Sequence, residues 1–329
     1  MRIAVDAMGG DYAPEEIIKG TLMAAEKWPD LQLILVGQQA QILPFFTGTK
    51  PSNISLIEAS ELIGMDEHPA NAVRKKKDAS IVVATRLVKL GEADAVVSAG
   101  STGAQMASAL LGLRRIKGIE RPAIGTILPT AEGGKLILDV GANLDASPEH
   151  LCQYALMGSI YAEKILRIPD PRVGLLNIGS EEGKGNELTQ KTYPLLKETP
   201  INFIGNIEGR DVPYGRADVV VCEGFVGNVL LKTAEGLAGV FVQVIKERIT
   251  TTTIRKLGAM AVKPGLKEFA QMMDYAEYGG APLLGVNGIS IICHGSSKAK
   301  AIFNAIRVAQ ECVQVRLIEQ IQEDLPRKV

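Results

Sequence analysis

The sequence has little of what marks secreted, metal-binding or nucleic-acid-binding proteins. It contains 4 cysteines and 3 histidines among 329 residues, and neither set shows CxxC pairs or metal-ligand spacing. The N-terminus reaches Asp6 before any apolar run long enough for a signal peptide, so we expect reduced thiols in a cytoplasmic protein. Lys plus Arg number 36 and Asp plus Glu 37, a net charge of −1 that argues against nucleic acid as a partner. We expect no metal and no cofactor.

Several familiar site motifs are also absent. No GxSxG nucleophile motif occurs, and no GxGxxG motif follows the first expected strand. The segment from Gly179 to Lys184 is not a Walker A loop, because three residues separate its glycines and Gly185 stands where Ser or Thr is required. Cys293 and His294 could form a thiol–base pair. Adjacent strand residues point to opposite faces, however, which favours a buried structural cysteine.

The residues that are abundant predict an α/β fold. Glycine occupies 34 positions, about 10% against a usual ~7%, and short β-branched runs alternate with longer helical stretches. This alternation predicts a doubly wound, mainly parallel sheet in a single domain over residues 1–329. The expected strands are Arg2–Asp6, Leu31–Val36, Ile54–Glu58, Ala95–Ser98, Ala123–Leu128, Leu136–Asp139, Arg172–Asn177, Ile201–Ile204, Val219–Cys222 and Ile289–Cys293. The expected helices are Pro14–Lys27, Ala70–Leu90, Ala104–Arg115, Pro148–Leu166, Glu187–Lys197, Val229–Lys256, Leu266–Tyr275 and Ser297–Gln322.

Glycine and small polar residues follow seven of the ten expected strands. In open α/β sheets, ligands bind beyond the carboxyl ends of the strands, so these loops are the expected site. The loop Ser98–Gly103 is the best candidate for binding an anion, because its glycines let the backbone approach a ligand. Ser101 and Thr102 add hydroxyls where a helix begins. The alternative is a helix cap in a tight turn.

Eight blocks, in order, resemble the bacterial acyl-[acyl-carrier-protein]:phosphate acyltransferases of phospholipid synthesis. They are DAMGGDYAP (6–14), HPANAVRKKKDAS (68–80), SAGSTGA (98–104), LDVGAN (138–143), NIGSEEGKGNE (177–187), NIEGRD (206–211), VVCEGFVGNVLLKTAEG (220–236) and YGGAPLLGVNGISIICHGSS (278–297). The resemblance implies a fold related to phosphotransacetylases and isocitrate-type dehydrogenases. It also implies that a long acyl chain passes from acyl carrier protein to inorganic phosphate. The product would be an acyl phosphate for a membrane glycerol-phosphate acyltransferase.

That reaction needs no protein nucleophile, because phosphate itself attacks the thioester carbonyl. The chain must hold phosphate, stabilise the oxyanion and let a thiolate leave. We therefore assign catalytic roles to Lys184, His294 and Asn177; a solvated loop lysine and a structural histidine are the alternatives for the first two. The expected phosphate- and substrate-binding residues are Ser98, Gly100, Ser101, Thr102, Gly103, Asp139, Asn143, Gly179 and Ser296. Helix-cap and turn roles are the alternative for Asp139 and Asn143.

Two other functions stay open at this point. One is a phosphotransacetylase-like enzyme that uses acyl-CoA. The other is a non-catalytic membrane scaffold of the lipid pathway, against which the polar strand ends argue. For an acidic carrier protein, a cluster of basic residues is the expected docking patch, and a solvated helix face is the alternative. The cluster comprises Arg74, Lys75, Lys76 and Lys77, and a rival patch comprises Arg114, Arg115, Lys117 and Arg121.

Residues 229–277 predict a helical hairpin. Its first arm carries a seam at helical spacing that suits pairing across a homodimer, with packing on the parent domain as the alternative. The seam consists of Leu230, Ala234, Leu237, Phe241 and Val244. The tip is apolar within a basic collar, a pattern typical of peripheral insertion into an anionic membrane surface; burial in the dimer interface is the alternative. The tip residues are Leu257, Ala259, Met260 and Val262.

Overall fold

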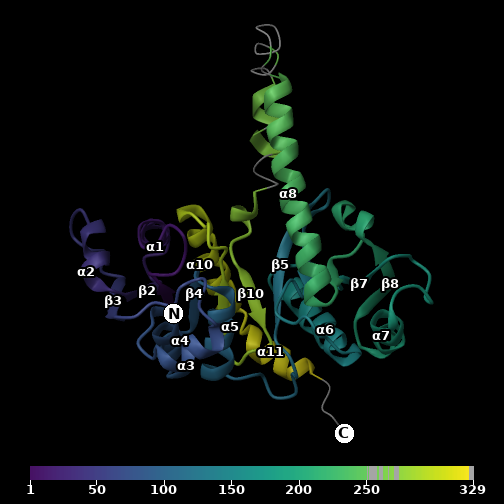
Figure 1. Cartoon of the computed structure of the whole chain (residues 1–329), viewed down its shortest axis with the longest axis horizontal. Helices are drawn as coiled ribbons and strands as arrows, with labels where there is room; N and C mark the ends of the chain where they lie inside the picture. The colour runs from purple at the N-terminus through teal and green to yellow at the C-terminus, as the bar shows by residue number, and fades with distance from the viewer. Residues whose placement is uncertain (250, 252–257, 259–261, 266, 270–273, 326–329) are drawn as a thin grey trace.

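An eleven-stranded sheet runs through the part of the chain that the computed structural model describes. The described residues are 1–249, 251, 258, 262–265, 267–269 and 274–325. The order across the sheet is β3-β2-β1-β4-β11-β10-β5-β6-β9-β7-β8, and helices cover both faces (Figure 1). The strands are β1 (Arg2–Asp6), β2 (Gln32–Gly37), β3 (Ile54–Glu58), β4 (Ala95–Ser98), β5 (Ala123–Thr130), β6 (Gly133–Leu138), β7 (Arg172–Asn177), β8 (Asn202–Glu208), β9 (Val219–Val221), β10 (Ala281–Leu284) and β11 (Ile289–Ile292).

Most of the sheet consists of two parallel groups of strands that run in opposite directions. β3, β2, β1, β4 and β11 form one parallel group, and β6, β9, β7 and β8 form the other. The antiparallel pairs β11–β10, β10–β5 and β5–β6 join the groups, so the second is reversed relative to the first. The prediction of a doubly wound, mainly parallel sheet is confirmed. The loops with glycine and small polar residues at the strand ends, however, divide into two sets, one for each strand group.

Helices pack on both faces because successive strand residues point to opposite sides. Ile3, Val5 and Leu136 share one core cluster with α1 (Glu15–Lys27), α6 (Pro148–Lys164) and α10 (Ala299–Gln314). Ala4 and Ile137 belong to clusters on the other face, with α4 (Ser80–Lys89), α5 (Thr102–Gly112) and the base of α8 (Gly224–Ile249). This two-sided burial explains why the strands read as nearly continuous apolar runs.

The stretch expected as one helix over Ala70–Leu90 is two helices. α3 (Pro69–Lys75) ends well before α4 begins. Between them, the N–H of Ser80 donates to the carbonyl oxygen of Glu61 at 3.1 Å instead of continuing the helix. Pairing with the segment before α3 therefore overrides the helical pattern of the sequence.

The expected helix Ser297–Gln322 is also broken. α10 is followed by α11 (Leu317–Asp324), and Arg316 between them has a φ of 54° in the left-handed region. β10 was not predicted, because it contains Pro282, a residue depleted in strands. The short α2 (Gln39–Ile42) was missed as well, whereas α7 (Glu187–Glu198) agrees closely with its predicted range.

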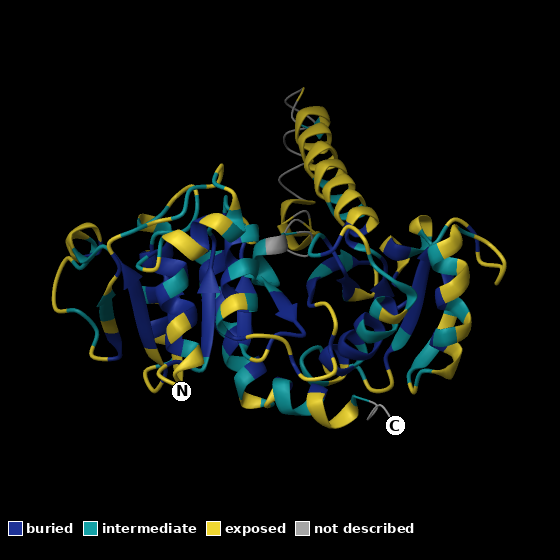
Figure 2. Cartoon of the chain, turned by 60° about the horizontal axis from the view of Figure 1, so that its bottom comes forward, coloured by how far each residue is buried: buried dark blue, intermediate teal, exposed yellow. Residues whose placement is uncertain are grey.

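α8 stands away from the sheet (Figure 1) and begins at Gly224, earlier than the predicted Val229. Leu230 and Ala234 of the predicted seam pack against the core beneath the helix. Farther along, Leu237 is 51% exposed and Phe241 58% exposed, and Figure 2 shows this part of α8 exposed around its circumference. By length and composition alone, α8 could cross a membrane.

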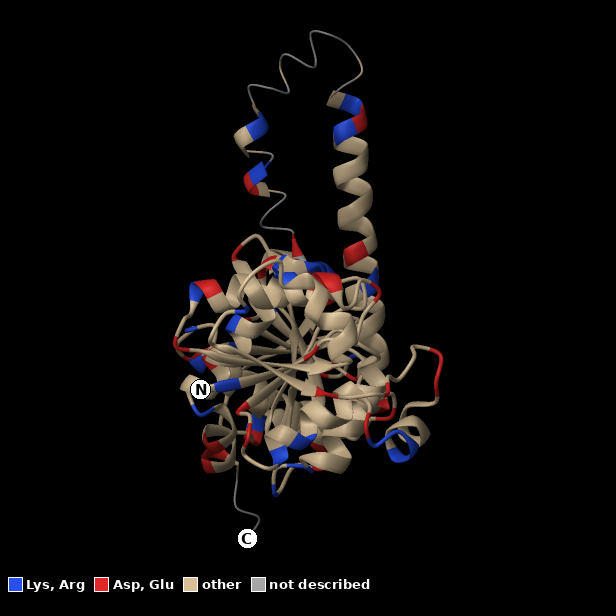
Figure 3. Ribbon diagram, turned by 90° about the vertical axis from the view of Figure 1, so that its left-hand side faces the viewer, with Lys and Arg blue, Asp and Glu red and all other residues tan. Residues whose placement is uncertain are grey.

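The far end of the hairpin lies mostly outside the described residues. Leu257, Ala259 and Met260 of the predicted tip are among those not described, whereas Val262 is exposed. Of the expected helix Leu266–Tyr275, residues 267–269 are helical. Figure 3 shows both basic and acidic residues at the end of α8 and an uncharged stretch below them.

Candidate functional site

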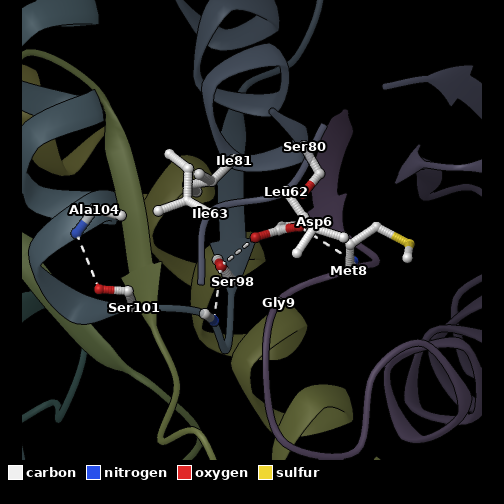
Figure 4. A pocket seen from close by; sticks show the side chains of 11 residues that line it. Asp6, Met8, Gly9, Leu62, Ile63, Ser80, Ile81, Ser98, Ser101 and Ala104 are labelled. Atoms are coloured by element: carbon white, nitrogen blue, oxygen red, sulfur yellow. Dashed lines mark hydrogen bonds between the residues drawn. The ribbon is translucent and has the colours of Figure 1, made fainter. Parts of the chain in front are cut away.

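The loops that follow β1 and β4 meet over one small pocket (Figure 4). Because β1 and β4 are neighbouring parallel strands, their carboxyl ends bring Asp6 and Ser98 side by side. Its polar lining residues and glycines are Asp6, Gly9, Ser80, Ser98, Gly100 and Ser101, and its apolar lining residues are Met8, Leu62, Ile63, Ile81 and Ala104. Ser98, Gly100 and Ser101, which the sequence assigned to phosphate binding, thus lie together.

Asp6 is the buried ionisable group of this pocket, with 2% of its surface exposed. Its Oδ2 accepts a hydrogen bond from the Ser98 hydroxyl at 2.6 Å, and its Oδ1 accepts one from the N–H of Met8 at 3.2 Å. The hydroxyl of Ser80 and the N–H of Gly9 also face the carboxyl and favour its charged form. Burial raises the pKa of Asp6, and these hydrogen bonds oppose that rise.

The two loops approach each other more closely than a side chain at position 9 would permit. A Cβ on Gly9 would lie 2.6 Å from Oδ2 of Asp6 and 2.7 Å from the backbone nitrogen of Gly100. Both atoms belong to groups that are already held in place, so neither can move aside easily. Glycine at position 9 is therefore a condition for the pocket's shape.

α5 begins at Thr102, directly beside the pocket. Ser101 is its N-cap, and the Ser101 hydroxyl accepts a hydrogen bond from the N–H of Ala104 at 3.4 Å. The N–H groups of Thr102 and Gly103 precede the first bonds of the helix and point out of its N-terminus. Ser98 differs, since its hydroxyl donates to Asp6 and accepts from the N–H of Gly100 at 3.0 Å. Among the described contacts, the hydrogen-bond donors that this loop leaves unused are thus those of residues 101–103, whereas Ser98 shapes the loop.

Two lining residues of the pocket, Leu62 and Ile63, belong to the segment 60–67, which Lys76 holds in place. The ammonium of Lys76 donates to the carbonyl oxygen of Leu62 at 2.9 Å and forms a salt bridge with Glu67 at 2.6 Å. Within the predicted docking patch, Lys76 therefore has an internal role. Arg74, Lys75 and Lys77 are exposed.

His294 lies after β11, between the pocket loops and α8. Its Nδ1 is 2.8 Å from the hydroxyl oxygen of Ser296, and its Nε2 is 3.4 Å from Nζ of Lys232 in α8. The carbonyl oxygen of Gly295 accepts a hydrogen bond from the N–H of Asp11 at 2.8 Å, which ties this loop to the one after β1. The structure thus places His294 and Ser296 beside the β1 loop. Lys232 connects them to α8, the helix that follows β9 of the reversed strand group.

Asp139 and Asn143 form a compact loop after β6. Asn143 donates from its side chain to Asp139 at 3.1 Å and to the carbonyl oxygen of Pro122 at 2.6 Å. Burial raises the pKa of Asp139, which is fully buried. The carboxylate also accepts hydrogen bonds from the N–H groups of Ile124, Gly141, Ala142 and Asn143. This geometry matches the turn role that the sequence left open as the alternative.

Asn177, Gly179 and Lys184 share the loop after β7. The side chain of Asn177 donates to the carbonyl oxygen of Lys184 at 3.0 Å, and the ammonium of Lys184 lies 4.0 Å from Glu181. β7 is separated from β4 by five strands of the sheet. These residues therefore follow a strand of the reversed group, whereas Ser98 ends a strand of the other group.

Asp6, Ser80 and Lys232 are residues of this region that the sequence analysis did not select. Asp6 had a signal, because it stands directly after the first strand in the motif DAMGGD. Ser80 ends the block HPANAVRKKKDAS, but the expected helix ran through it, so no separate role was expected for it. Lys232 lay in a helix expected to serve dimerisation, and only the fold shows its approach to His294.

Burial disfavours thiol chemistry at Cys293. Cys293 is buried, and burial raises its pKa to about 12, which agrees with a structural cysteine rather than a nucleophile paired with His294. No group of three or more His, Cys, Asp or Glu side chains that could hold a metal ion occurs in the described part of the chain.

Sequence comparison shows extensive similarity to known proteins. The model of the family described as "Fatty acid synthesis protein" matches residues 1–320. A phosphate acyltransferase of Desulfitobacterium hafniense (strain DSM 10664 / DCB-2) is 72% identical over 329 residues, which cover 99% of this chain and 98% of that protein. A phosphate acyltransferase of Heliobacterium modesticaldum (strain ATCC 51547 / Ice1) is 61% identical over 332 residues, covering 100% and 99%.

Solved structures show the same fold at low identity. A phosphotransacetylase from Streptococcus pyogenes superposes with a TM-score of 0.65 and 18% identity over 95% of this chain and 94% of that chain. The EutD phosphotransacetylase from Staphylococcus aureus gives 0.61 and 18%, over 94% of each chain. From its sequence matches, the chain belongs to the fatty acid synthesis protein family, among the phosphate acyltransferases, and is an acyltransferase that uses phosphate.

Proposed function

We propose that this chain transfers a long-chain acyl group reversibly from acyl carrier protein to inorganic phosphate, and so makes acyl phosphate for phospholipid synthesis. The observation that carries the proposal is the glycine loop of residues 98–103. It places Ser101 in the lining of the pocket and the N-terminus of α5 beside it. A helix N-terminus stabilises an anion by about 0.3–1 kcal/mol before direct hydrogen bonds are counted.

Phosphate bound at this loop acts as the nucleophile. One of its oxygens attacks the thioester carbonyl, a tetrahedral oxyanion forms, and the C–S bond then breaks to release a thiolate. A thiol with a pKa of ~8.5 needs little acid assistance near neutral pH. His294 is the proposed donor to the oxyanion, because it lies beside the β1 loop and contacts both Ser296 and Lys232.

The loop of Asn177, Gly179 and Lys184 is proposed to bind the acyl donor from the reversed strand group. Lys184 has 52% of its side chain exposed, so its ammonium is accessible to an anionic substrate. Asp139 and Asn143 are proposed to act through the shape of their loop, because their polar atoms already bond to it.

Comparing donors tests the proposal. The purified protein is supplied with phosphate and either palmitoyl carrier protein or palmitoyl-CoA, and acyl phosphate is measured. Faster turnover with the carrier protein supports the proposal. Preference for palmitoyl-CoA identifies a phosphotransacetylase-like enzyme, and absence of turnover with both donors leaves the scaffold. Ser101→Ala should raise the KM for phosphate. Thr21→Val, which removes a buried hydroxyl of α1, serves as the control.

Carrier docking is proposed at the end of α3. Arg74, Lys75 and Lys77 are exposed there, and the chain reaches the pocket residues Ser80 and Ile81 directly afterwards. An acidic carrier bound at this patch would thus hold its thioester close to the pocket. We expect Arg74→Glu with Lys75→Glu to slow association and reduce its salt dependence. Arg114→Glu with Lys117→Glu tests the exposed rival patch, and an effect from that pair alone would relocate docking there.

The hairpin is proposed to join two chains into a homodimer and to rest its tip on an anionic membrane, which would place a cytoplasmic enzyme peripherally at the bilayer. Leu237, Val240 and Phe241 support pairing, since full burial of each would contribute about 1.5–3 kcal/mol. Leu237→Glu with Phe241→Glu should produce monomers by mass. Val262→Glu should instead reduce liposome co-sedimentation at unchanged dimer mass. Unchanged mass and unchanged pelleting would contradict the two roles.

A further inference from the structure

We propose that Asp6 is a positioning residue for phosphate, acting through Ser98 to set the conformation of the loop at residues 98–103. The inference rests on the proposed phosphate role of that loop. It assigns to Asp6 no contact with substrate.

The carboxyl of Asp6 joins two separate parts of the chain and lies close to a third. The N–H of Met8 bonds to it from its own loop, and the hydroxyl of Ser98 bonds to it from the end of β4. Ser80, at the start of α4, also lines the pocket, and its N–H donates to the carbonyl oxygen of Glu61. One buried group thus fixes the relative positions of the β1 loop and the loop at residues 98–103, beside the chain that follows the docking patch.

The direction of the hydrogen bonds gives Asp6 control over the loop. A serine hydroxyl has one hydrogen, and that of Ser98 is donated to Asp6 at 2.6 Å. The Ser98 oxygen is therefore left to accept from the N–H of Gly100, at 3.0 Å. Gly100 directly precedes Ser101 and the first amides of α5, so the orientation of its peptide group affects theirs. Asp6 thus acts on these amides through the Ser98 hydroxyl and the Gly100 backbone, a relay of two hydrogen bonds.

A carboxylate suits this position better than an amide does. The groups that bond to Asp6 are both donors, namely the N–H of Met8 and the hydroxyl of Ser98. The hydroxyl of Ser80 and the N–H of Gly9 also favour the charged form of Asp6. An asparagine would present its NH₂ group to one set of these donors, and the tight approach of Gly9 leaves little room for adjustment. A negative group beside an anion also opposes binding of that anion. A positioning role therefore explains why an aspartate stands at position 6, whereas direct contact between its carboxylate and phosphate does not.

The test compares Asp6→Asn and Ser98→Ala with Asp218→Asn. Asp218 is also a buried aspartate, held by Lys135 and Arg172, and it precedes β9 away from the pocket. We expect the phosphate KM of both pocket variants to rise by about tenfold, since a hydrogen bond to a charged group is lost, while the KM for the acyl donor changes less than about twofold. Asp218→Asn should lower the melting temperature and leave the phosphate KM unchanged.

Unchanged phosphate KM in active pocket variants would overturn the role of Asp6. Equal rises in the KM values for phosphate and acyl donor would overturn it too, because they indicate general loss of the site. If Asp6→Asn does not fold, Ser98→Ala decides alone, since it removes the relay and keeps the carboxylate. A wild-type protein that makes no acyl phosphate would instead reject the proposed function, and the inference with it.

Discussion

Asp6 and Asp139 are both buried aspartates at strand ends, but their hydrogen bonds differ in reach. Asp139 accepts mainly from its own loop and from Ile124 on the adjoining strand β5. Asp6 accepts from segments that are far apart in the sequence, including Ser98. A local network fixes the shape of one turn, whereas a long-range network fixes one loop against another. The comparison teaches that similar burial of a carboxylate can serve stability in one place and position a site in another.

The largest expected effect is that of Asp139→Ala on stability. The change leaves several buried N–H groups without an acceptor, so the free energy of unfolding should fall by about 3–5 kcal/mol. Chemical denaturation measures it. Asn143→Ala, which removes the neighbouring amide donor, should cost less. A loss below about 1 kcal/mol for Asp139→Ala would contradict the local role and erase the contrast with Asp6.

A smaller effect separates buried aspartates by their pH dependence. Burial alone would raise the pKa of Asp218, but hydrogen bonds from Arg172 and Lys135 outweigh it and lower this pKa from 3.8 to about 2. The stability that Asp218 contributes is therefore present above pH 3.8 and lost as pH falls toward 2. The difference in unfolding free energy between wild type and Asp218→Asn should be about 2 kcal/mol larger at pH 7 than at pH 2.

Asp139 should show the opposite sign. Its pKa is raised by burial, so the folded protein binds the proton more tightly than the unfolded chain does. Its contribution is highest below the unfolded pKa and falls as pH rises through the folded value. In wild type, the free energy of unfolding should therefore fall as pH rises through the folded pKa of Asp139. Asp139→Asn should not show this fall, and chemical denaturation at a series of pH values measures the difference. Parallel pH profiles for Asp139→Asn and Asp218→Asn would contradict the distinction.

The fold was predictable to the extent that it depends on local pattern. Apolar runs covered on both faces identified most strands, and helical spacing identified most helices. Breaks that depend on tertiary contacts were missed, such as the one where Ser80 bonds to Glu61 between α3 and α4. The reversal of the second strand group had no local signal either, because it arises from the antiparallel pairs around β10 and β5.

The site was predictable only in part, for a related reason. Glycine and hydroxyl residues identified the loop at residues 98–103, since their chemistry is visible in the sequence. The sequence does not show which polar atoms are already used. Ser98 donates to Asp6, and Lys76 bonds to Glu67, so their polar groups have internal partners in the fold. Motifs thus predict where a site lies more readily than which atoms it offers.

The smallest expected effect comes from Thr102→Val, at the first position of α5. Valine keeps the shape of threonine and removes the hydroxyl, so a single hydrogen bond of about 0.5–1.5 kcal/mol is lost from the proposed phosphate site. The phosphate KM should rise roughly two- to tenfold, with an unchanged KM for the acyl donor. Thr85→Val is the matched control, because the buried hydroxyl of Thr85 bonds only to the helical carbonyl of Ile81 among the described contacts. An unchanged phosphate KM in Thr102→Val would remove this hydroxyl from the site. Binding would then depend on the Ser101 hydroxyl and the backbone amides, whose placement Asp6 is proposed to set.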